Sequence, residues 1–253
     1  GISAMSASGK YGKTAICAGI VGFADLTMGA SVEEVLIAQV SAGNGRFKGI
    51  RYGAGYDTST AINNSHTDPP SGLYNDTIFR EGFAKLRQFD LSFEAWLYHT
   101  QILDVVSLAE AFPDQKIVLN HLGGPIGIGP YEGKQKEVFD KWKRSINALS
   151  KHSNVYVKLG GLGMVLNGYQ LDKRETPPSS IELSELWRPY FDATIEAFSP
   201  KRCMFESNFP VDKVTSSYAV YWNCFKRITQ NASKEEKQFL FHDTANQFYK
   251  LDL

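Results

Sequence analysis

The sequence predicts an α/β protein with a parallel sheet, and three observations lead to this prediction. Short apolar runs alternate with segments of helical periodicity along all 253 residues. Hydrophobic residues make up 43% and charged residues 21% of the chain, as is usual for a globular protein. No change in composition marks a linker between two parts. We therefore expect a single domain built of βα units.

Six apolar runs bounded by turn residues are expected to form strands. Most contain β-branched or aromatic residues, which favour strands. The expected strands are 14–23 (TAICAGIVGF), 47–53 (FKGIRYG), 91–99 (LSFEAWLYH), the run within 116–120 (KIVLN), 154–163 (NVYVKLGGLG) and 202–212 (RCMFESNFPVD).

Helices are expected between these strands. Ser31 and Glu34 form a capping-box pattern before a helix that ends at about Gly43, and Ser233 and Glu236 form another before the last helix. Two long loops, 57–75 and the glycine-rich 123–133, are expected near a functional site. The remaining helices are expected at about 76–88, 103–112, 138–149 and 183–198, with two more at the end of the chain.

The charge balance and the cysteines narrow the classes of partner. The formal net charge is zero and no run of lysine and arginine occurs, which argues against nucleic acid or an anionic membrane as the main partner. No apolar stretch is as long as a membrane span. The three cysteines lie among apolar neighbours without motif spacing, a pattern typical of reduced core thiols in a cytoplasmic protein. A small-molecule substrate is the expected partner.

Residues able to do chemistry follow strand after strand. In parallel α/β folds the ligand lies at the carboxyl ends of the strands, so these side chains are the candidates for a site. They are Arg51, Tyr52, Tyr98, His99, Asn120, His121, Lys158, Glu206, Asn208 and Asp212.

Each of the main candidates also has a structural interpretation. His121 would equally suit a hydrogen bond to a loop carbonyl, and His99 a helix cap. Arg51 could pair with Glu94 or Glu206 across neighbouring strands. For Lys158 the alternative is a solvated strand end. These alternatives stay open on the sequence alone.

Several common motifs are absent. The glycines of HLGGPIGIGP match neither GxxxxGK[ST] nor a GxGxxG that opens a helix, so a doubly wound nucleotide-binding protein has no support. We interpret them as room for a sharp turn beside the site. No CxxC, HExxH or GxSxG occurs, which leaves zinc-finger, zincin and serine-hydrolase functions without a motif.

Five segments together resemble the amidohydrolase-related family, whose members include 2-pyrone-4,6-dicarboxylate lactonase and sugar-lactonase-like hydrolases. The resemblance spans essentially the whole chain. It implies a (β/α)8 TIM barrel that hydrolyses an ester, lactone or amide, in many members with a divalent metal that activates water. The segments are AGIVGFADLTMG, GRFKGIRYGAGYD, FEAWLYH, IVLNHLGGP and RCMFESNFPVDK.

The resemblance also implies roles for individual residues. His121 matches a histidine that binds the metal or polarises the carbonyl. Asn208 stands where many members carry an aspartate that is both metal ligand and general base, roles that an asparagine fills poorly. Asp212 would take over the role expected at Asn208 only if its loop folds back. Arg51, Tyr98 and His99, with Tyr52, Lys158 and Glu206 nearby, are the expected contacts of a carboxylated or hydroxyl-rich substrate.

The chain departs from the family pattern at its start. Only six of eight strands are expected, and no H-x-H pair occurs. We therefore expect residues 1–253 to be a single barrel domain that lacks its amino-terminal strands, and sheet edges to be exposed.

Two hypotheses follow. The first is a hydrolase of a lactone or small carboxylated ester or amide, with one divalent metal (zinc or manganese) in the complete protein or with none. The second is a non-catalytic, degenerate barrel that binds a ligand or a protein partner. A homo-oligomer is compatible with both.

Overall fold

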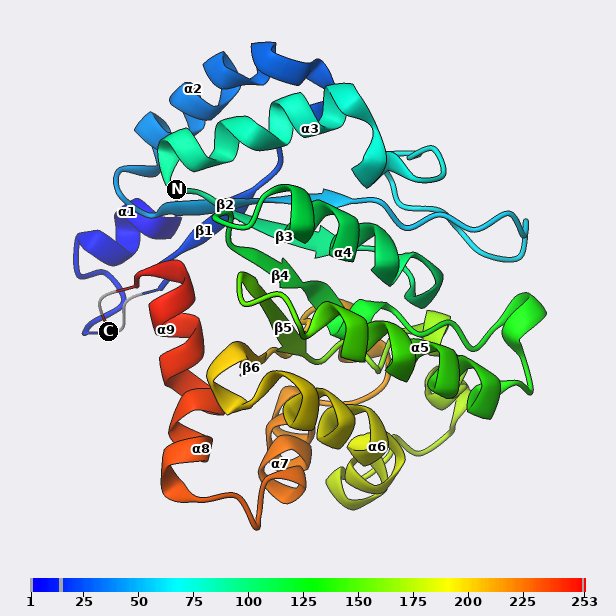
Figure 1. Cartoon of the computed structure of the whole chain (residues 1–253). Helices are drawn as coiled ribbons and strands as arrows, with labels where there is room; N and C mark the ends of the chain where they lie inside the picture. The colour runs from blue at the N-terminus through cyan, green and yellow to red at the C-terminus, as the bar shows by residue number, and fades with distance from the viewer. Residues whose placement is uncertain (1, 14–15, 252) are drawn as a thin grey trace.

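One curled sheet of six parallel strands organises the protein. The computed structural model describes residues 2–13, 16–251 and 253. The spatial order of the strands, β1-β2-β3-β4-β5-β6, is their order along the chain, and together they form half of a barrel (Figure 1). The strands are β1 Ile20–Gly22, β2 Phe47–Gly53, β3 Ser92–Trp96, β4 Ile117–Leu119, β5 Val155–Leu159 and β6 Cys203–Phe205.

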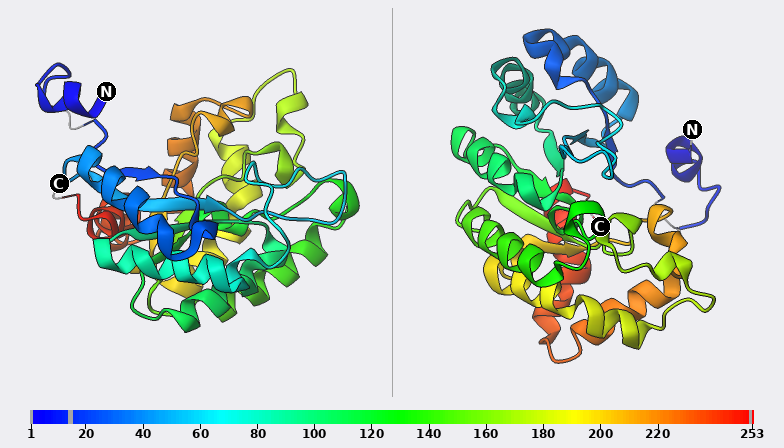
Figure 2. Two further views of the ribbon diagram at one scale, coloured as in Figure 1. Left: turned by 90° about the horizontal axis from the view of Figure 1, so that it is seen from above. Right: turned by 90° about the vertical axis from the view of Figure 1, so that its right-hand side faces the viewer.

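Helices connect the strands and form an arc outside the sheet, whereas α1 stands apart from the rest of the molecule (Figure 2). Short segments labelled η interrupt or extend them; those used below are η1 Leu26–Val32, η5 Asn120–Gly123, η10 Val211–Val214 and η11 Phe239–Asp243. The helices are α1 Ile2–Ala7, α2 Glu33–Gly43, α3 Thr77–Ala84, α4 Ile102–Ala111, α5 Gln135–Leu149, α6 Ser180–Phe198, α7 Tyr218–Ile228, α8 Lys234–Gln238 and α9 Thr244–Tyr249.

Strand alternation separates an apolar face from a charged face. Successive side chains of a strand point to opposite faces of the sheet. Ile50 and Phe93 are fully buried in the main core, whereas Arg51 is paired in register with Glu94 on the other, concave face. Lys158 occupies the corresponding position on β5, next to Met204 of β6. The same alternation therefore builds the core and presents charged groups inside the half-barrel.

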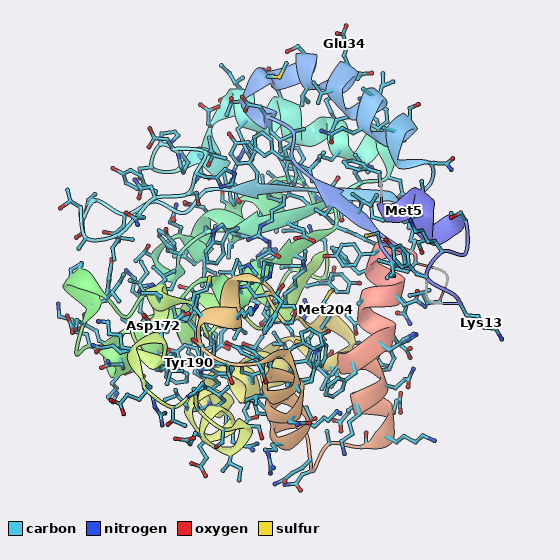
Figure 3. All side chains as sticks on the ribbon, turned by 180° about the vertical axis from the view of Figure 1, so that it is seen from behind. Met5, Lys13, Glu34, Asp172, Tyr190 and Met204 are labelled. Carbon is cyan, nitrogen blue, oxygen red and sulfur yellow. The ribbon has the colours of Figure 1, made fainter. Side chains whose placement is uncertain are left out.

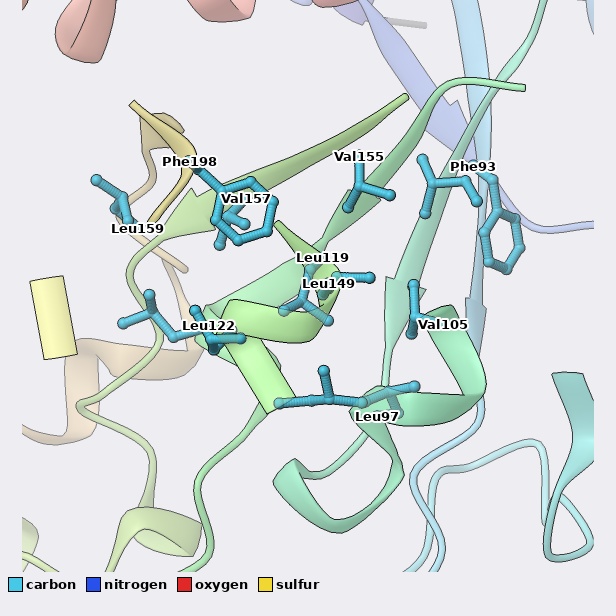
Figure 4. Close-up of a cluster of buried hydrophobic side chains, with 14 of the residues drawn as sticks. Phe93, Leu97, Val105, Leu119, Leu122, Leu149, Val155, Val157, Leu159 and Phe198 are labelled. Atoms are coloured by element: carbon cyan, nitrogen blue, oxygen red, sulfur yellow. The ribbon is translucent and has the colours of Figure 1, made fainter. Parts of the chain in front are cut away.

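The main core lies between the sheet and the outer helices. Leu119 and Val157 of the strands pack there with Val105 of α4 and Leu149 of α5, all fully buried (Figure 4). Truncating one such side chain to alanine typically costs about 2–5 kcal/mol, because a cavity remains. This core fixes the strands whose ends carry the candidate site.

The last helix, α9, reaches the concave face from the amino ends of the strands. Its Phe248 packs in a small cluster with Val118 of β4 and Met204 of β6, which is labelled in Figure 3. A cavity beside it is lined by Ser92 and Lys116, at the start of β3 and just before β4. The end of the chain thus lies under the half-barrel, opposite the loops that follow the strands.

The expected strands are confirmed in number, order and direction. Most are shorter than expected: β1 begins at Ile20, β3 ends at Trp96, β5 ends at Leu159 and β6 ends at Phe205. Residues 14 and 15 of the first expected run lie outside the described residues. The curled arrangement of consecutive parallel strands agrees with the expected TIM-barrel class. The expectation of two further strands that would close the barrel stays a prediction.

The helix predictions hold with one correction. The capping box of Ser233 and Glu236 is confirmed. That of Ser31 is wrong, because Ser31 lies within η1 and its hydroxyl donates to the Met28 carbonyl. Cys17 is exposed rather than in the core. Among the described residues, no helix is both long and apolar enough to cross a membrane.

Candidate active site

The chain turns sharply at the end of β4 and places His121 inside the half-barrel. His121 has a φ of +54° and Leu122 a φ of +55°, and two glycines complete the turn. His121 is 2% exposed. Space for its ring is made by Gly161, where an added Cβ would lie 2.5 Å from the His121 Cβ and where φ is +76°. A side chain at position 161 would therefore displace the imidazole.

Both ring nitrogens of His121 have a partner. Nδ1 lies 2.5 Å from Oε1 of Glu206, which also accepts the His121 backbone N–H at 3.1 Å. Nε2 lies 2.9 Å from Nη2 of Arg51. A guanidinium only donates hydrogen bonds, so Nε2 accepts and the proton resides on Nδ1, donated to Glu206. The geometry thus specifies a neutral imidazole whose lone pair faces Arg51.

Glu206 is held ionised by its surroundings. Burial alone would raise the pKa of this carboxyl group. The contact with His121 and the positive charges of Lys158 and Arg51 outweigh burial and lower the pKa to about 2. The negative charge in turn fixes the orientation of the His121 ring, as carboxylate partners of functional histidines do.

Lys158 is part of a second buried pair. Its Nζ lies 2.8 Å from Oε1 of Glu94 and 3.9 Å from Oε2 of Glu206. Burial favours the neutral form of Glu94, but the charge of Lys158 and the hydrogen bonds from Lys158 and Tyr249 lower its pKa overall. Asn120 donates to the other oxygen of Glu94 at 3.2 Å. Lys158 is therefore an enclosed cation and not a solvated strand end.

Arg51, Glu94 and Lys158 line a cavity of about 340 Å³ on the concave face. Trp96 lies beside His121 and Arg51, with its ring 4.8 Å from that of His121 and 5.9 Å from the Arg51 guanidinium carbon. Two cationic side chains facing one cavity favour an anionic ligand. The cavity is lined by Gly19, Val21, Arg51, Glu94, Lys158, Tyr249 and Leu251.

Asn208 and Asp212 form a separate unit beside Glu206. Asn208 donates its Nδ2 proton to Asp212 Oδ1 at 2.7 Å, and the Gly163 backbone N–H donates to Oδ2 at 3.2 Å. Burial raises the pKa of Asp212 to about 7; the two hydrogen bonds oppose this and the Glu206 charge adds to it. The loop thus folds back and brings Asp212 next to Asn208. The Asp212 side chain, however, is fully buried.

The remaining sequence candidates lie away from this cavity. Tyr52 points to the outer side, where its hydroxyl donates to Asp25 at 3.3 Å and burial raises its pKa to about 12. Tyr98 donates to the Asn63 carbonyl of the 57–75 loop.

His99 lines another pocket, beside Tyr131. Its Nδ1 accepts the Ile126 N–H at 3.3 Å, and burial lowers its pKa to about 4. The structure therefore brings together Arg51, His121, Lys158 and Glu206, but not Tyr52, Tyr98 or His99.

Two residues of the candidate site, Glu94 and Tyr249, are not among the candidates predicted from the sequence. Glu94 was considered only as a partner of Arg51, yet it binds Lys158; a lone glutamate in the apolar run LSFEAWLYH is the signal that identifies it. Tyr249 lies 155 residues further along the chain, and its hydroxyl donates to Glu94. No local pattern connects a tyrosine near the carboxyl terminus with a strand so distant in sequence.

The fold and the site define an α/β half-barrel with a charged centre at its strand ends, and comparisons with known proteins give its family. The family model described as amidohydrolase matches residues 13–251. The chain is 36% identical over 233 residues to a Sinorhizobium fredii protein named y4mH, covering 92% of this chain and 70% of that protein. The chain belongs to the amidohydrolase family.

More distant relatives carry functional names. An L-fucono-1,5-lactonase of Burkholderia multivorans is 25% identical over 178 residues, which is 70% of this chain and 57% of the lactonase. The chain thus spans little more than half the length of that enzyme.

Solved structures show the same fold. A zinc-bound amidohydrolase from Burkholderia multivorans superposes with a TM-score of 0.75 at 21% identity, covering 98% of this chain and 78% of that one. A 2-pyrone-4,6-dicarboxylic acid hydrolase from Pseudomonas putida gives 0.54 at 16% identity, covering 89% and 79%.

A divalent metal does not fit the donor set of the described residues. Among them no group of three histidine, cysteine, aspartate or glutamate side chains could hold a metal ion. Glu206 occupies Nδ1 of His121, so a metal could bind only at Nε2, and Nε2 already accepts a hydrogen bond from Arg51. Asn208 donates its amide proton to Asp212, and its side chain carries no charge that would attract a cation. No catalytic step is therefore assigned to a metal here.

Proposed function

We propose that the protein is a hydrolase of lactones or small carboxylated esters or amides, in which water attacks the carbonyl carbon. Membership of the amidohydrolase family and the names of the lactonase relatives support the reaction class. The observation that carries the proposal is the orientation of His121 between Glu206 and Arg51. A neutral imidazole fixed by a carboxylate is a suitable general base.

His121 would take a proton from water at Nε2 while the water oxygen bonds to the carbonyl carbon. Before that, a substrate carboxylate competes with Nε2 for the Arg51 guanidinium and so releases the lone pair. The carbonyl oxygen becomes an oxyanion, which the Arg51 guanidinium stabilises electrostatically. The oxyanion then re-forms the carbonyl as the carbon–oxygen or carbon–nitrogen bond breaks, and the leaving atom receives the proton from His121. A lactone gives a hydroxy acid, an ester an alcohol and an acid, and an amide an amine and an acid.

Replacement of His121 tests this assignment. Initial rates would be measured on a panel of lactones and esters with and without a free carboxylate, with and without a chelator. The His121→Gln variant should be about 100-fold slower or worse, the contribution typical of a general base. His242→Gln is a matched control, because His242 is exposed and contacts Asp243 on η11. Hydrolysis that is equally fast in His121→Gln would refute the role of His121.

A second candidate function is ligand binding without catalysis. It is favoured by the contact between Asn208 and Asp212, which leaves the described strand ends without a free carboxylate base beside His121. The same panel decides: saturable binding of an acid with no hydrolysis of its lactone or ester would support this function.

A further inference from the structure

We propose that Tyr249, near the end of the chain, is a positioning residue of the anion-binding cavity: through Glu94 it holds Lys158 where a substrate carboxylate binds. This inference rests on the proposed function for the identity of the substrate. The binding of a carboxylate, however, is measurable without turnover.

The first observation is that Tyr249 and Lys158 share one acceptor. The Tyr249 hydroxyl donates to Oε1 of Glu94, the same oxygen that lies 2.8 Å from the Lys158 Nζ. Asn120 donates to Oε2. Three donors from α9, β5 and the end of β4 therefore fix one carboxylate, and an oriented carboxylate in turn orients the ammonium group.

The second observation is a direct contact between the tyrosine ring and the lysine. The Nζ of Lys158 lies 5.7 Å from the centre of the Tyr249 ring. An ammonium group at this distance from an aromatic ring is attracted to it. Tyr249 thus limits the position of Lys158 both through Glu94 and through its own ring.

The third observation is where the hydroxyl lies. Tyr249 lines the cavity together with Arg51, Glu94 and Lys158. Its surroundings and the Glu94 charge raise its pKa well above 10, so it remains a neutral donor. It adds no charge that would compete with a bound anion. Its effect is therefore on the geometry of Lys158.

The arrangement also separates binding from chemistry. Lys158 faces Glu94 at 2.8 Å but Glu206, the partner of His121, only at 3.9 Å. Loss of the Tyr249 hydroxyl should first disturb the lysine and leave the 2.5 Å contact of His121 with Glu206 intact. We therefore expect an effect on KM for acidic substrates and little effect on kcat.

The test uses the whole chain and the variants Tyr249→Phe and Tyr156→Phe. Tyr156 is the matched control: it lies on β5, its ring is 4.8 Å from that of Phe248, and within the described part of the chain its hydroxyl makes no hydrogen bond. Succinate is the probe, its dissociation constant followed by calorimetry and by the fluorescence of Trp96, whose ring lies 5.9 Å from the Arg51 guanidinium carbon.

Tyr249→Phe should weaken succinate binding by about tenfold, the size expected for one hydrogen bond to a charged group. KM for a carboxylated lactone should rise by a similar factor while kcat and the KM of an uncharged lactone stay within about twofold. Tyr156→Phe should behave as the wild type. In a Lys158→Met background, Tyr249→Phe should cause no further loss, which excludes a general folding defect.

The outcomes are distinguishable. Unchanged succinate binding in Tyr249→Phe, an equal loss for the uncharged lactone, or a wild type that binds no succinate would each overturn the inference. A wild type that binds succinate and depends on Tyr249, but hydrolyses nothing, would support the inference and refute the proposed hydrolase.

Discussion

The two carboxylates that follow β6 differ in the partners that surround them. Glu206 contacts His121 and lies near the positive charges of Lys158 and Arg51, which lower its pKa to about 2. Asp212 lies six residues later; among the described residues its carboxylate accepts hydrogen bonds from the neutral donors Asn208 and Gly163, and burial raises its pKa to about 7.

The difference shows that the surroundings of a carboxyl group, and not its residue type, determine its protonation state. Pairs of acids whose surroundings drive their pKa values apart are typical of catalytic sites. Here Glu206 has the properties of a permanent anion that orients His121. Asp212 has those of a group that gains or loses a proton near neutrality.

The largest effect is expected from Glu206→Gln. This change leaves the charges of Lys158 and Arg51 without one counter-ion and replaces the charged acceptor of the His121 Nδ1 proton by a neutral amide. We expect a loss of about 4 kcal/mol in the free energy of unfolding, as for other broken buried pairs. Urea unfolding near pH 7 measures it. A variant as stable as the wild type would show that Glu206 is not the anion described here.

The lowered pKa of Glu206 also predicts a loss of stability in acid. The pKa of Glu206 is lowered from its ordinary value of 4.5 to about 2 in the folded protein. Its contribution to stability is therefore complete above about pH 4.5 and is lost as the pH falls towards 2. In Glu206→Gln this part of the acid dependence should be absent, which unfolding at a series of acidic pH values would test.

Asp212 should contribute the opposite dependence on pH, and Asp212→Asn tests this contribution. The pKa of Asp212 rises from 3.8 to about 7 on folding, so the folded state binds more protons between these values and its stability falls as the pH rises through them. Between about pH 5 and pH 8 this amounts to about 3 kcal/mol. The asparagine variant should lose this slope. An unchanged slope would contradict a titrating Asp212.

Asn208→Asp tests the neutral partner of Asp212. It replaces the amide donor, 2.7 Å from Oδ1, by a second acidic group. Two adjacent carboxylates raise each other's affinity for a proton. Stability near pH 8 should fall by about 2 kcal/mol, with less loss near pH 5. Equal losses at the two pH values would indicate a packing effect instead.

The smallest effect is expected from Thr215→Val. The Thr215 hydroxyl donates to the Gly163 carbonyl at 2.7 Å and leaves both oxygens of Asp212 untouched. Loss of this buried hydrogen bond should cost about 1 kcal/mol at every pH. Unfolding midpoints near pH 5 and pH 8 should therefore shift together, and a shift at only one of them would link Thr215 to the titration.

The fold could be predicted from the sequence because its signals are local. The alternation of apolar runs with helical periodicity identified all six strands, and FKGIRYG matches β2 residue for residue. The prediction from the sequence was wrong where two local patterns compete. Ser31 and Glu34 have the spacing of a capping box, but the chain forms η1 there, which includes a Gly29 with a φ of +59°.

The site could be predicted only in part, for a physical reason. Strand ends identify Arg51, His121, Lys158 and Glu206, since carboxyl ends meet at one edge of a parallel sheet. Which face a residue occupies depends on register, so adjacent Arg51 and Tyr52 point to opposite sides. The difference in pKa between Glu206 and Asp212 depends on neighbours far away in sequence, which no single segment reveals.

The order of the strands in the sheet has a consequence for folding during synthesis on the ribosome. Because each strand pairs with the strand made just before it, the sheet can grow as the chain emerges. The contact between Tyr249 and Glu94 joins residues 155 positions apart and can form only after all six described strands have been made. A nascent chain can therefore build its sheet progressively, whereas the contact that positions Lys158 forms after the sheet.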